Sequence, residues 1–179
     1  MRGIIFLKLK HFVETKFGIP AWKGLLESGG VANKTYLPGD NYDDAELVAL
    51  VGAAVTATGL PAPAIIEDFG VFIAPSLLGM YKHLLKPEWR TLDVIEHTEN
   101  TIHQVVRVNQ PGAKPPVLSV KRVRGNEVII DYRSQRKLCF LAVGIAKGMA
   151  QEYKENVEVT QSSCMHNGAS NCLISVKLK

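Results

Sequence analysis

The sequence predicts an α+β fold, in which a helical part is followed by a part that combines an antiparallel sheet with a helix. Apolar residues recur at helical spacing through roughly the first 110 residues. A proline-rich segment, NQPGAKPP at 109–116, then interrupts the pattern, and apolar and polar residues alternate beyond it. Because helices and strands are segregated along the chain, we expect a helical lobe over about 1–110 and a mixed lobe over about 111–179.

Start and stop signals locate the helices of the first part. Acidic residues at Asp43 and Asp44 suit the positive end of a helix dipole, and Gly59 suits a helix end. Pro61 or Pro63 opens the next helix, in which Pro75 predicts a break or kink, with residues 77–81 as an alternative continuation beyond it. The five expected helices cover residues 4–17, 21–27, 45–58, 61–73 and 91–108.

The second part is expected to contain four strands and one helix. Its helix carries Gly144 and Gly148 one turn apart, which makes a face that another backbone can approach closely. The expected strands cover residues 117–123, 127–132, 157–163 and 172–179, and the helix covers 135–153.

Composition limits the function classes. With 46% hydrophobic and 21% charged residues, the chain of 179 residues is globular rather than disordered. Its net charge of +4 is spread out, and the local cluster Lys121, Arg122 and Arg124 is typical of a solvated turn, so no nucleic-acid partner is expected. We expect a cytoplasmic protein without a membrane span, and no enzyme, because no nucleophile with an oriented base is suggested.

His103 is the most informative histidine. It lies on the fifth expected helix, beside the apolar Ile102 and Val105, and shares a face with Glu99 and Arg107. A histidine in this position is either a satisfied residue at the edge of the core or a metal ligand, since neutral imidazole is a common ligand of haem iron. The helix alone leaves both interpretations open.

A second group lies at 132–136, YRSQR. If the strand runs that far, the side chains of Tyr132, Ser134 and Arg136 project to one side. Two hydroxyls and a guanidinium make a clamp for a carboxylate or phosphate, whereas a strand end with solvated polar groups has the same pattern.

A third group consists of Cys139, Cys164, His166 and Cys172. Three thiols and an imidazole are an established tetrahedral zinc set, although the spacing C-x-H-x₅-C is not a common finger pattern. In the alternative interpretation Cys139 is a small buried apolar residue and the others belong to a hairpin. Three cysteines make a poor disulfide framework, which agrees with a reducing compartment.

Several further segments follow one another in a characteristic order. They are MRGIIF, ELVALVGAAVTATGLP, Phe69-Gly70, His103 followed by Val106, PGAKPP and YRSQR. In this order they resemble the haem nitric oxide/oxygen binding (H-NOX) domains, as found in stand-alone bacterial members, which are related to the haem domain of soluble guanylate cyclase. The resemblance covers the whole chain, as a single domain over residues 1–179. The C-terminal part alone is also similar to small-molecule domains of the vinyl-reductase type.

The resemblance implies a b-type haem held between the helical and mixed lobes. His103 is then the proximal iron ligand, and Tyr132, Ser134 and Arg136 hold the haem propionates. Ile5 and Pro116 match positions that press against the haem and distort it.

The resemblance also implies a gas preference. Members that hold oxygen stably use a distal tyrosine with polar neighbours, and the matching positions here are Leu141, Leu9 and Ile73. An apolar pocket offers no hydrogen bond to bound O₂, so NO and CO are the expected ligands.

The implied function is a haem-based nitric oxide sensor that signals by release of His103. Its output passes to a separate effector such as a histidine kinase or a cyclic-di-GMP enzyme. Some members carry a zinc site of the kind that Cys139, Cys164, His166 and Cys172 would form. The alternatives are a redox-responsive zinc protein and a binder of a hydrophobic small molecule, as in the vinyl-reductase type.

Overall fold

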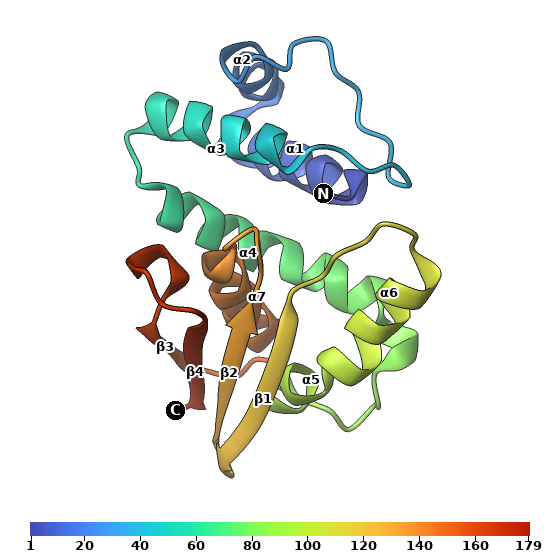
Figure 1. Ribbon diagram of the computed structural model, residues 1–179, viewed down its shortest axis with the longest axis vertical. Coiled ribbons are helices and arrows are strands. Elements are labelled where there is room, and N and C mark those ends of the chain that lie inside the picture. Colours follow the sequence, from blue (N-terminus) through green and yellow to red (C-terminus); the bar gives the residue numbers. More distant parts are fainter. The chain divides into compact units, whose positions relative to one another are not determined.

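The computed structural model describes residues 1–179, which form two compact units, Met1–Phe69 and Gly70–Lys179 (Figure 1). The division therefore falls inside a helix, whereas the seam expected at 111–116 separates the helical from the strand-containing part of the sequence. The predicted α+β class is confirmed, because all the strands follow the first six α-helices. The first unit contains α1 (Gly3–Phe17), α2 (Ile19–Ser28), α3 (Asp44–Thr58) and the start of α4 (Ala62–Met80).

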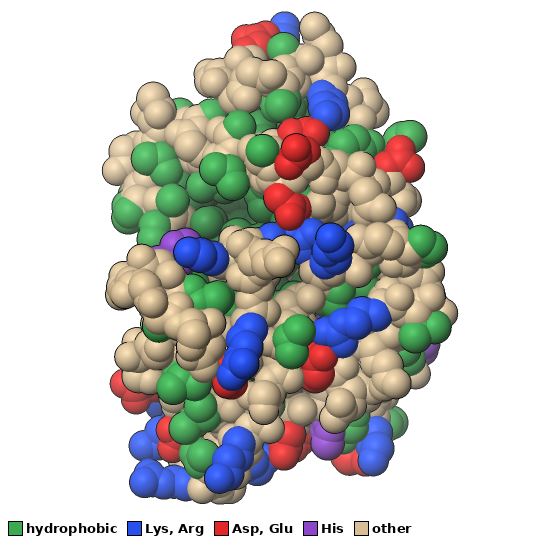
Figure 2. Space-filling view, viewed as in Figure 1, with side chains coloured by type: hydrophobic (Ala, Val, Ile, Leu, Met, Phe, Trp, Pro, Cys, Tyr) green, Lys and Arg blue, Asp and Glu red, His purple; other side chains and the backbone are tan.

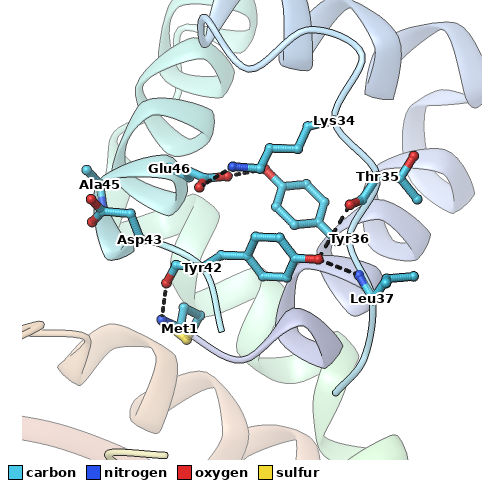
Figure 3. A network of polar contacts seen from close by, with 9 residues as sticks. All are labelled: Met1, Lys34, Thr35, Tyr36, Leu37, Tyr42, Asp43, Ala45 and Glu46. Atoms are coloured by element: carbon cyan, nitrogen blue, oxygen red, sulfur yellow. Dashed lines mark hydrogen bonds and ion pairs between the residues drawn. The ribbon is translucent and has the colours of Figure 1, made fainter. Parts of the chain in front are cut away.

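Stacked aromatic rings form the centre of the first unit. Phe6 of α1 lies parallel to Tyr36, with ring centroids 4.2 Å apart, and Tyr42 meets the edges of both rings. The Tyr36 hydroxyl donates to Glu46 of α3 at 3.0 Å, and Lys34 pairs with the same carboxylate at 2.6 Å (Figure 3). These contacts hold the loop before α3 against α1 and α3, so a segment without regular structure contributes to the core.

Helix α3 has the ends that its sequence predicts. The Asp43 side chain accepts a hydrogen bond from the amide of Ala45 at 2.9 Å, which makes Asp43 the N-cap (Figure 3). Gly59 ends the helix in the left-handed conformation, with φ of 69°, and its amide donates to the Val55 carbonyl. The expected boundaries, 45–58, are correct within one residue.

Helix α4 runs from Ala62 to Met80 with Pro75 inside it, so of the two predicted outcomes, a break or a kink, the break is wrong. Proline removes the amide that would bond to the Val71 carbonyl. That carbonyl faces α7 (Cys139–Glu152), where a Cβ added to Gly148 would lie 2.5 Å from its oxygen. Close packing against α7 therefore keeps the helix continuous. Its length and composition would also permit a membrane span, but Ile73 and Ala74 are buried within the fold.

The close approach predicted at Gly144 and Gly148 is confirmed. A Cβ on Gly70 of α4 would lie 2.6 Å from the Leu141 carbonyl oxygen and 2.8 Å from the Cα of Gly144. Backbone meets backbone at these glycines, so the two helices have no room for a methyl group between them.

The expected single helix over 91–108 is three segments instead. Its middle is a π-helical turn, in which the His103 amide donates to the Thr98 carbonyl five residues back, at 3.0 Å. The hydroxyls of Thr98 and Thr101 also bond to carbonyls four residues back, a pattern that bends helices. The segments are α5 (Thr91–His97), the π-turn (Glu99–His103) and α6 (Gln104–Asn109).

The four strands form one antiparallel sheet in the order β1-β2-β4-β3, as their alternation predicts. Helices α5 and α7 pack on one face of it, over the buried side chains of β2 and β4 (Figure 1). The helix expected from 135 begins only at Cys139. The strands are β1 (Val117–Arg124), β2 (Glu127–Arg133), β3 (Val157–Ser163) and β4 (Cys172–Leu178).

The basic cluster on the β1–β2 hairpin is partly neutralised. Arg122 pairs with Asp93 and Glu96 of α5, both at 2.7 Å. Figure 2 shows basic side chains interspersed with acidic ones around this end of the molecule. Arg122 therefore links β1 to α5. Its charge is used in these ion pairs and does not add a free cation to the cluster with Lys121 and Arg124.

Candidate functional site

His103 ends the π-turn, with its side chain only 14% exposed. Its Nδ1 lies 3.0 Å from Oε2 of Glu99, one turn earlier. Burial lowers the pKa of His103 below its usual value, although Glu99 and the Pro116 carbonyl oppose this shift. The ring is therefore neutral near pH 7, which is the form that binds metals.

Glu99 receives hydrogen bonds from three directions. Besides His103, the amide of Leu118 on β1 donates to Oε2 at 3.0 Å, and Arg107 pairs with Oε1 at 2.7 Å. Burial alone would raise the pKa of Glu99, but the hydrogen bonds from Arg107, His103 and Leu118 outweigh it and lower that pKa. Glu99 is therefore an anion, which can only accept.

The charge of Glu99 favours one tautomer of His103. Because the carboxylate carries no proton, the proton in the contact lies on Nδ1 of the neutral ring. The lone pair is then on Nε2, which makes Nε2 the atom that can bind a metal. The sequence alone indicates only that Glu99 and His103 share a helix face and assigns Glu99 no role.

Tyr132, Ser134 and Arg136 lie together, but not on one strand. β2 ends at Arg133, so Ser134 and Arg136 belong to the turn that follows. The Arg136 amide donates to Ser134 Oγ at 3.2 Å, and its guanidinium reaches the Lys114 carbonyl. Tyr132 is buried, which raises its pKa to about 12, and its hydroxyl interacts with Ser134.

The three thiols converge as predicted. The sulfur atoms of Cys139, Cys164 and Cys172 lie within 4.8 Å of one another, and those of Cys139 and Cys164 are 3.8 Å apart. All three are free cysteines. Burial raises the pKa of Cys139 to about 12; burial also acts to raise that of Cys164, but hydrogen bonds, chiefly from the His166 amide, lower it.

His166 is not grouped with the sulfur atoms. Its Nε2 lies 2.7 Å from the Lys137 carbonyl oxygen, and its ring stacks on Phe140 with centroids 5.5 Å apart. A neighbour missed by sequence reasoning is Gln161 of β3, which hydrogen-bonds to Cys139 and whose Oε1 is buried without a partner. Strand alternation offers no signal for such a contact, since a glutamine on an edge strand is ordinarily solvated.

The residues that the sequence matches to the gas-discriminating and haem-distorting positions of the family, Leu9, Ile73, Leu141 and Ile5, lie on three helices. Ile73 is buried on α4 and Leu141 is half-buried on α7, the two helices that meet at their glycines. Leu9 is buried and Ile5 half-buried on α1 of the first unit. None of these side chains can donate a hydrogen bond.

Comparison with known proteins decides the family. A family model described as Haem-NO-binding matches residues 2–161. The chain belongs to this family. Its members are haem-binding gas-sensor domains, soluble and not catalytic.

Solved H-NOX structures share the fold over the whole chain. An H-NOX protein from S. oneidensis in the Fe(II)NO ligation state matches with a TM-score of 0.93 and 25% identity, covering 100% of this chain and 99% of that one. The unliganded Fe(II) H-NOX protein from K. algicida matches with a TM-score of 0.87 and 19% identity, covering 100% and 97%.

A longer protein is also similar. Soluble guanylate cyclase gcy-31 of Caenorhabditis elegans is 22% identical over 145 residues, which are 76% of this chain and 20% of the cyclase. The H-NOX chain thus spans about a fifth of that curated relative.

Proposed function

We propose that this H-NOX chain binds haem b through His103 and senses nitric oxide. The observation that carries the proposal is the neutral, largely buried imidazole whose Nδ1 is held by anionic Glu99, which leaves Nε2 as the donor atom. A neutral imidazole with its other nitrogen fixed by a carboxylate is a suitable haem ligand. When bound, haem supplies an iron that takes a diatomic gas.

Tyr132, Ser134 and Arg136 are proposed to hold the haem propionates. Arg136 supplies a permanent charge with several donors, and the two hydroxyls supply further donors. The local turn already brings Ser134 and Arg136 into contact, and burial keeps the Tyr132 hydroxyl protonated, so it remains a donor at neutral pH. Ile5 and Pro116 remain the residues proposed to press against the haem.

The apolar side chains favour NO and CO over O₂. Bound O₂ carries partial negative charge and is held by hydrogen-bond donors, which Ile73, Leu141 and Leu9 lack. We propose these three residues as the determinants of discrimination against O₂. Replacing Leu141 with tyrosine would introduce a donor and is expected to increase oxygen affinity.

The proposed output is release of His103. This histidine ends a π-turn, where the regular α-helical hydrogen bonding is already interrupted between α5 and α6. Such turns are frequent at functional sites. A separate effector, such as a histidine kinase or a cyclic-di-GMP enzyme, is proposed to read the resulting change.

Zn²⁺ is proposed as a second cofactor, on the thiols. Two sulfur ligands of a tetrahedral zinc lie about 3.8 Å apart, from Zn–S bonds of about 2.3 Å. The separation of 3.8 Å between Cys139 and Cys164 matches that value. Cys172 supplies a third ligand, and His166 becomes the fourth if its ring leaves the Lys137 carbonyl.

An absorption spectrum tests the haem proposal. The reduced, haem-loaded protein should show a Soret band that shifts with NO and does not change stably with air, and His103→Ala should lose normal haem uptake. A stable spectral change in air would contradict the proposed discrimination against O₂. Absence of any Soret band, with His103→Ala behaving as wild type, would favour a hydrophobic small-molecule binder.

Metal analysis tests the zinc proposal. The wild-type chain should retain one zinc per chain after desalting, and Cys164→Ser should lose it while Ser163→Ala retains it. Equal metal content in all three proteins would contradict a thiol site. Zinc binding without haem binding would favour the redox-responsive zinc protein.

A further inference from the structure

We propose that Glu99 is the positioning residue of His103, and that it connects the haem ligand to strand β1. This inference rests on the proposed role of His103 as the ligand. It goes further because it names the group that selects the tautomer, orients the ring and links it to the sheet.

The geometry of one carboxylate supports this role. Oε2 of Glu99 lies 3.0 Å from both His103 Nδ1 and the Leu118 amide, and Oε1 lies 2.7 Å from Arg107. With its side chain 20% exposed, Glu99 is largely withdrawn from water. An acceptor fixed by two other donors holds the imidazole in one orientation, whereas a solvated glutamate would not.

The contact with Leu118 makes the link to the sheet. β1 is an edge strand, and Leu118 pairs in register with Tyr132 of β2. The Leu118 amide points to Glu99, so this side-chain oxygen satisfies a backbone donor of the edge strand. His103 is thereby connected through Glu99 and Leu118 to the residue opposite Tyr132, the first member of the proposed propionate clamp.

The charge of Glu99 also affects the ligand strength of His103. An anionic acceptor at Nδ1 draws the proton toward itself and raises the electron density at Nε2. Arg107 and the Leu118 amide share the same charge, so the effect is moderated. We expect a stronger bond to iron than with a neutral acceptor, and a defined ring orientation both before and after release.

Two substitutions separate charge from position. Glu99→Gln keeps the size and an acceptor oxygen but removes the charge, and Glu99→Ala removes both. Glu96→Gln is the matched control, because Glu96 lies on the preceding α5 and its carboxylate pairs with Arg122 rather than with the His103 ring.

The first readout needs no haem. Nitrogen NMR of the haem-free protein should show His103 as the Nδ1-protonated tautomer in wild type and in Glu96→Gln. In Glu99→Ala the Nε2-protonated tautomer should become populated. A wild-type ring with the Nε2 proton, or an unchanged tautomer in Glu99→Ala, would overturn the proposal even if the chain bound no haem.

The second readout uses ferrous, haem-loaded protein. The iron–histidine stretching frequency in resonance Raman spectra should fall in Glu99→Gln and fall further or broaden in Glu99→Ala, and the haem affinity of the latter should drop about 10–100-fold. Glu96→Gln should match wild type. If wild type and all three variants take up haem and show the same iron–histidine stretching frequency, the role of Glu99 is refuted while the proposed haem function stands. Lack of uptake by wild type would refute the haem function, and the NMR result would then decide the role of Glu99.

Discussion

Replacing Gly148 with alanine should destabilise the second unit, although alanine is the better helix former. A Cβ at this position would lie 2.5 Å from the Val71 carbonyl oxygen, 2.7 Å from the Ala74 Cβ and 3.0 Å from the Val71 Cα. Carbon and carbonyl oxygen in favourable contact are about 3.3–3.6 Å apart. The two helices must therefore separate by about 1 Å, because the obstructing atoms belong mainly to backbone.

The expected cost follows from two opposing contributions. Overpacking a well-packed core costs about 1–3 kcal/mol, and a backbone obstruction lies at the upper end because no side chain can turn away. The higher helix propensity of alanine raises the free energy of unfolding by about 1 kcal/mol relative to glycine. The net loss is about 2 kcal/mol, which lowers the melting temperature by about 4–8 °C for a chain of this size.

Thermal unfolding followed by circular dichroism measures this difference. Gly79→Ala is the matched control, since Gly79 lies on α4 and has no atom within 4 Å of its added Cβ. It should be neutral or raise the melting temperature, while Gly70→Ala should lower it as Gly148→Ala does. A Gly148→Ala protein as stable as the Gly79→Ala protein would refute the backbone contact between α4 and α7.

Three further outcomes are expected. Asp43→Ala should lower the free energy of unfolding by about 1 kcal/mol in urea titrations because the N-cap is lost, and Asp43→Asn should not. Tyr132 should ionise only near its raised pKa of about 12. Its contribution to stability is therefore complete below pH 10 and lost as the pH rises from about 10 to about 12. The difference in phenolate absorbance between wild type and Tyr132→Phe measures this ionisation, and ionisation near pH 10 would contradict the burial of Tyr132. In metal-free protein, alkylation followed by mass spectrometry should modify Cys164 before Cys139 and Cys172, which are buried, and equal rates would contradict that packing.

Local chemistry made much of the fold predictable. Asp43 and Gly59 placed α3 within one residue of its observed ends, because an N-cap and a left-handed C-cap act through their immediate neighbours. Pro75 predicted a break or kink, and the break does not occur because the effect of a proline on a helix depends on packing partners that are distant in sequence. The carbonyl that it leaves without an amide lies against Gly148, which is remote in sequence.

In the site, too, features set by neighbouring residues could be predicted from the sequence, whereas features set by residues distant in the sequence could not. The convergence of three cysteines could be inferred from strand alternation and a turn, whereas His166 faces the Lys137 carbonyl because the short helical turn at Met165–Asn167 interrupts that alternation. Periodicity could not distinguish the π-turn from a regular helix either, since it changes the hydrogen-bond register without changing the residue types.

Glu99 illustrates why the chemistry of a ligand cannot be read from the ligand alone. Its spacing from His103 permits a contact on any helix, and such pairs are usually solvated and weak. This pair has a defined geometry because two other groups hold the carboxylate of Glu99 in place and keep it anionic. They are the amide of Leu118, nineteen residues farther along the chain, and the guanidinium of Arg107. The carboxylate then determines which nitrogen of His103 is available. Through Glu99, the Leu118 amide at the edge of the sheet thus helps to determine that Nε2 is the donor atom of the proposed haem ligand. Any movement of His103 on release must change the hydrogen bonds that join His103, Glu99 and Leu118.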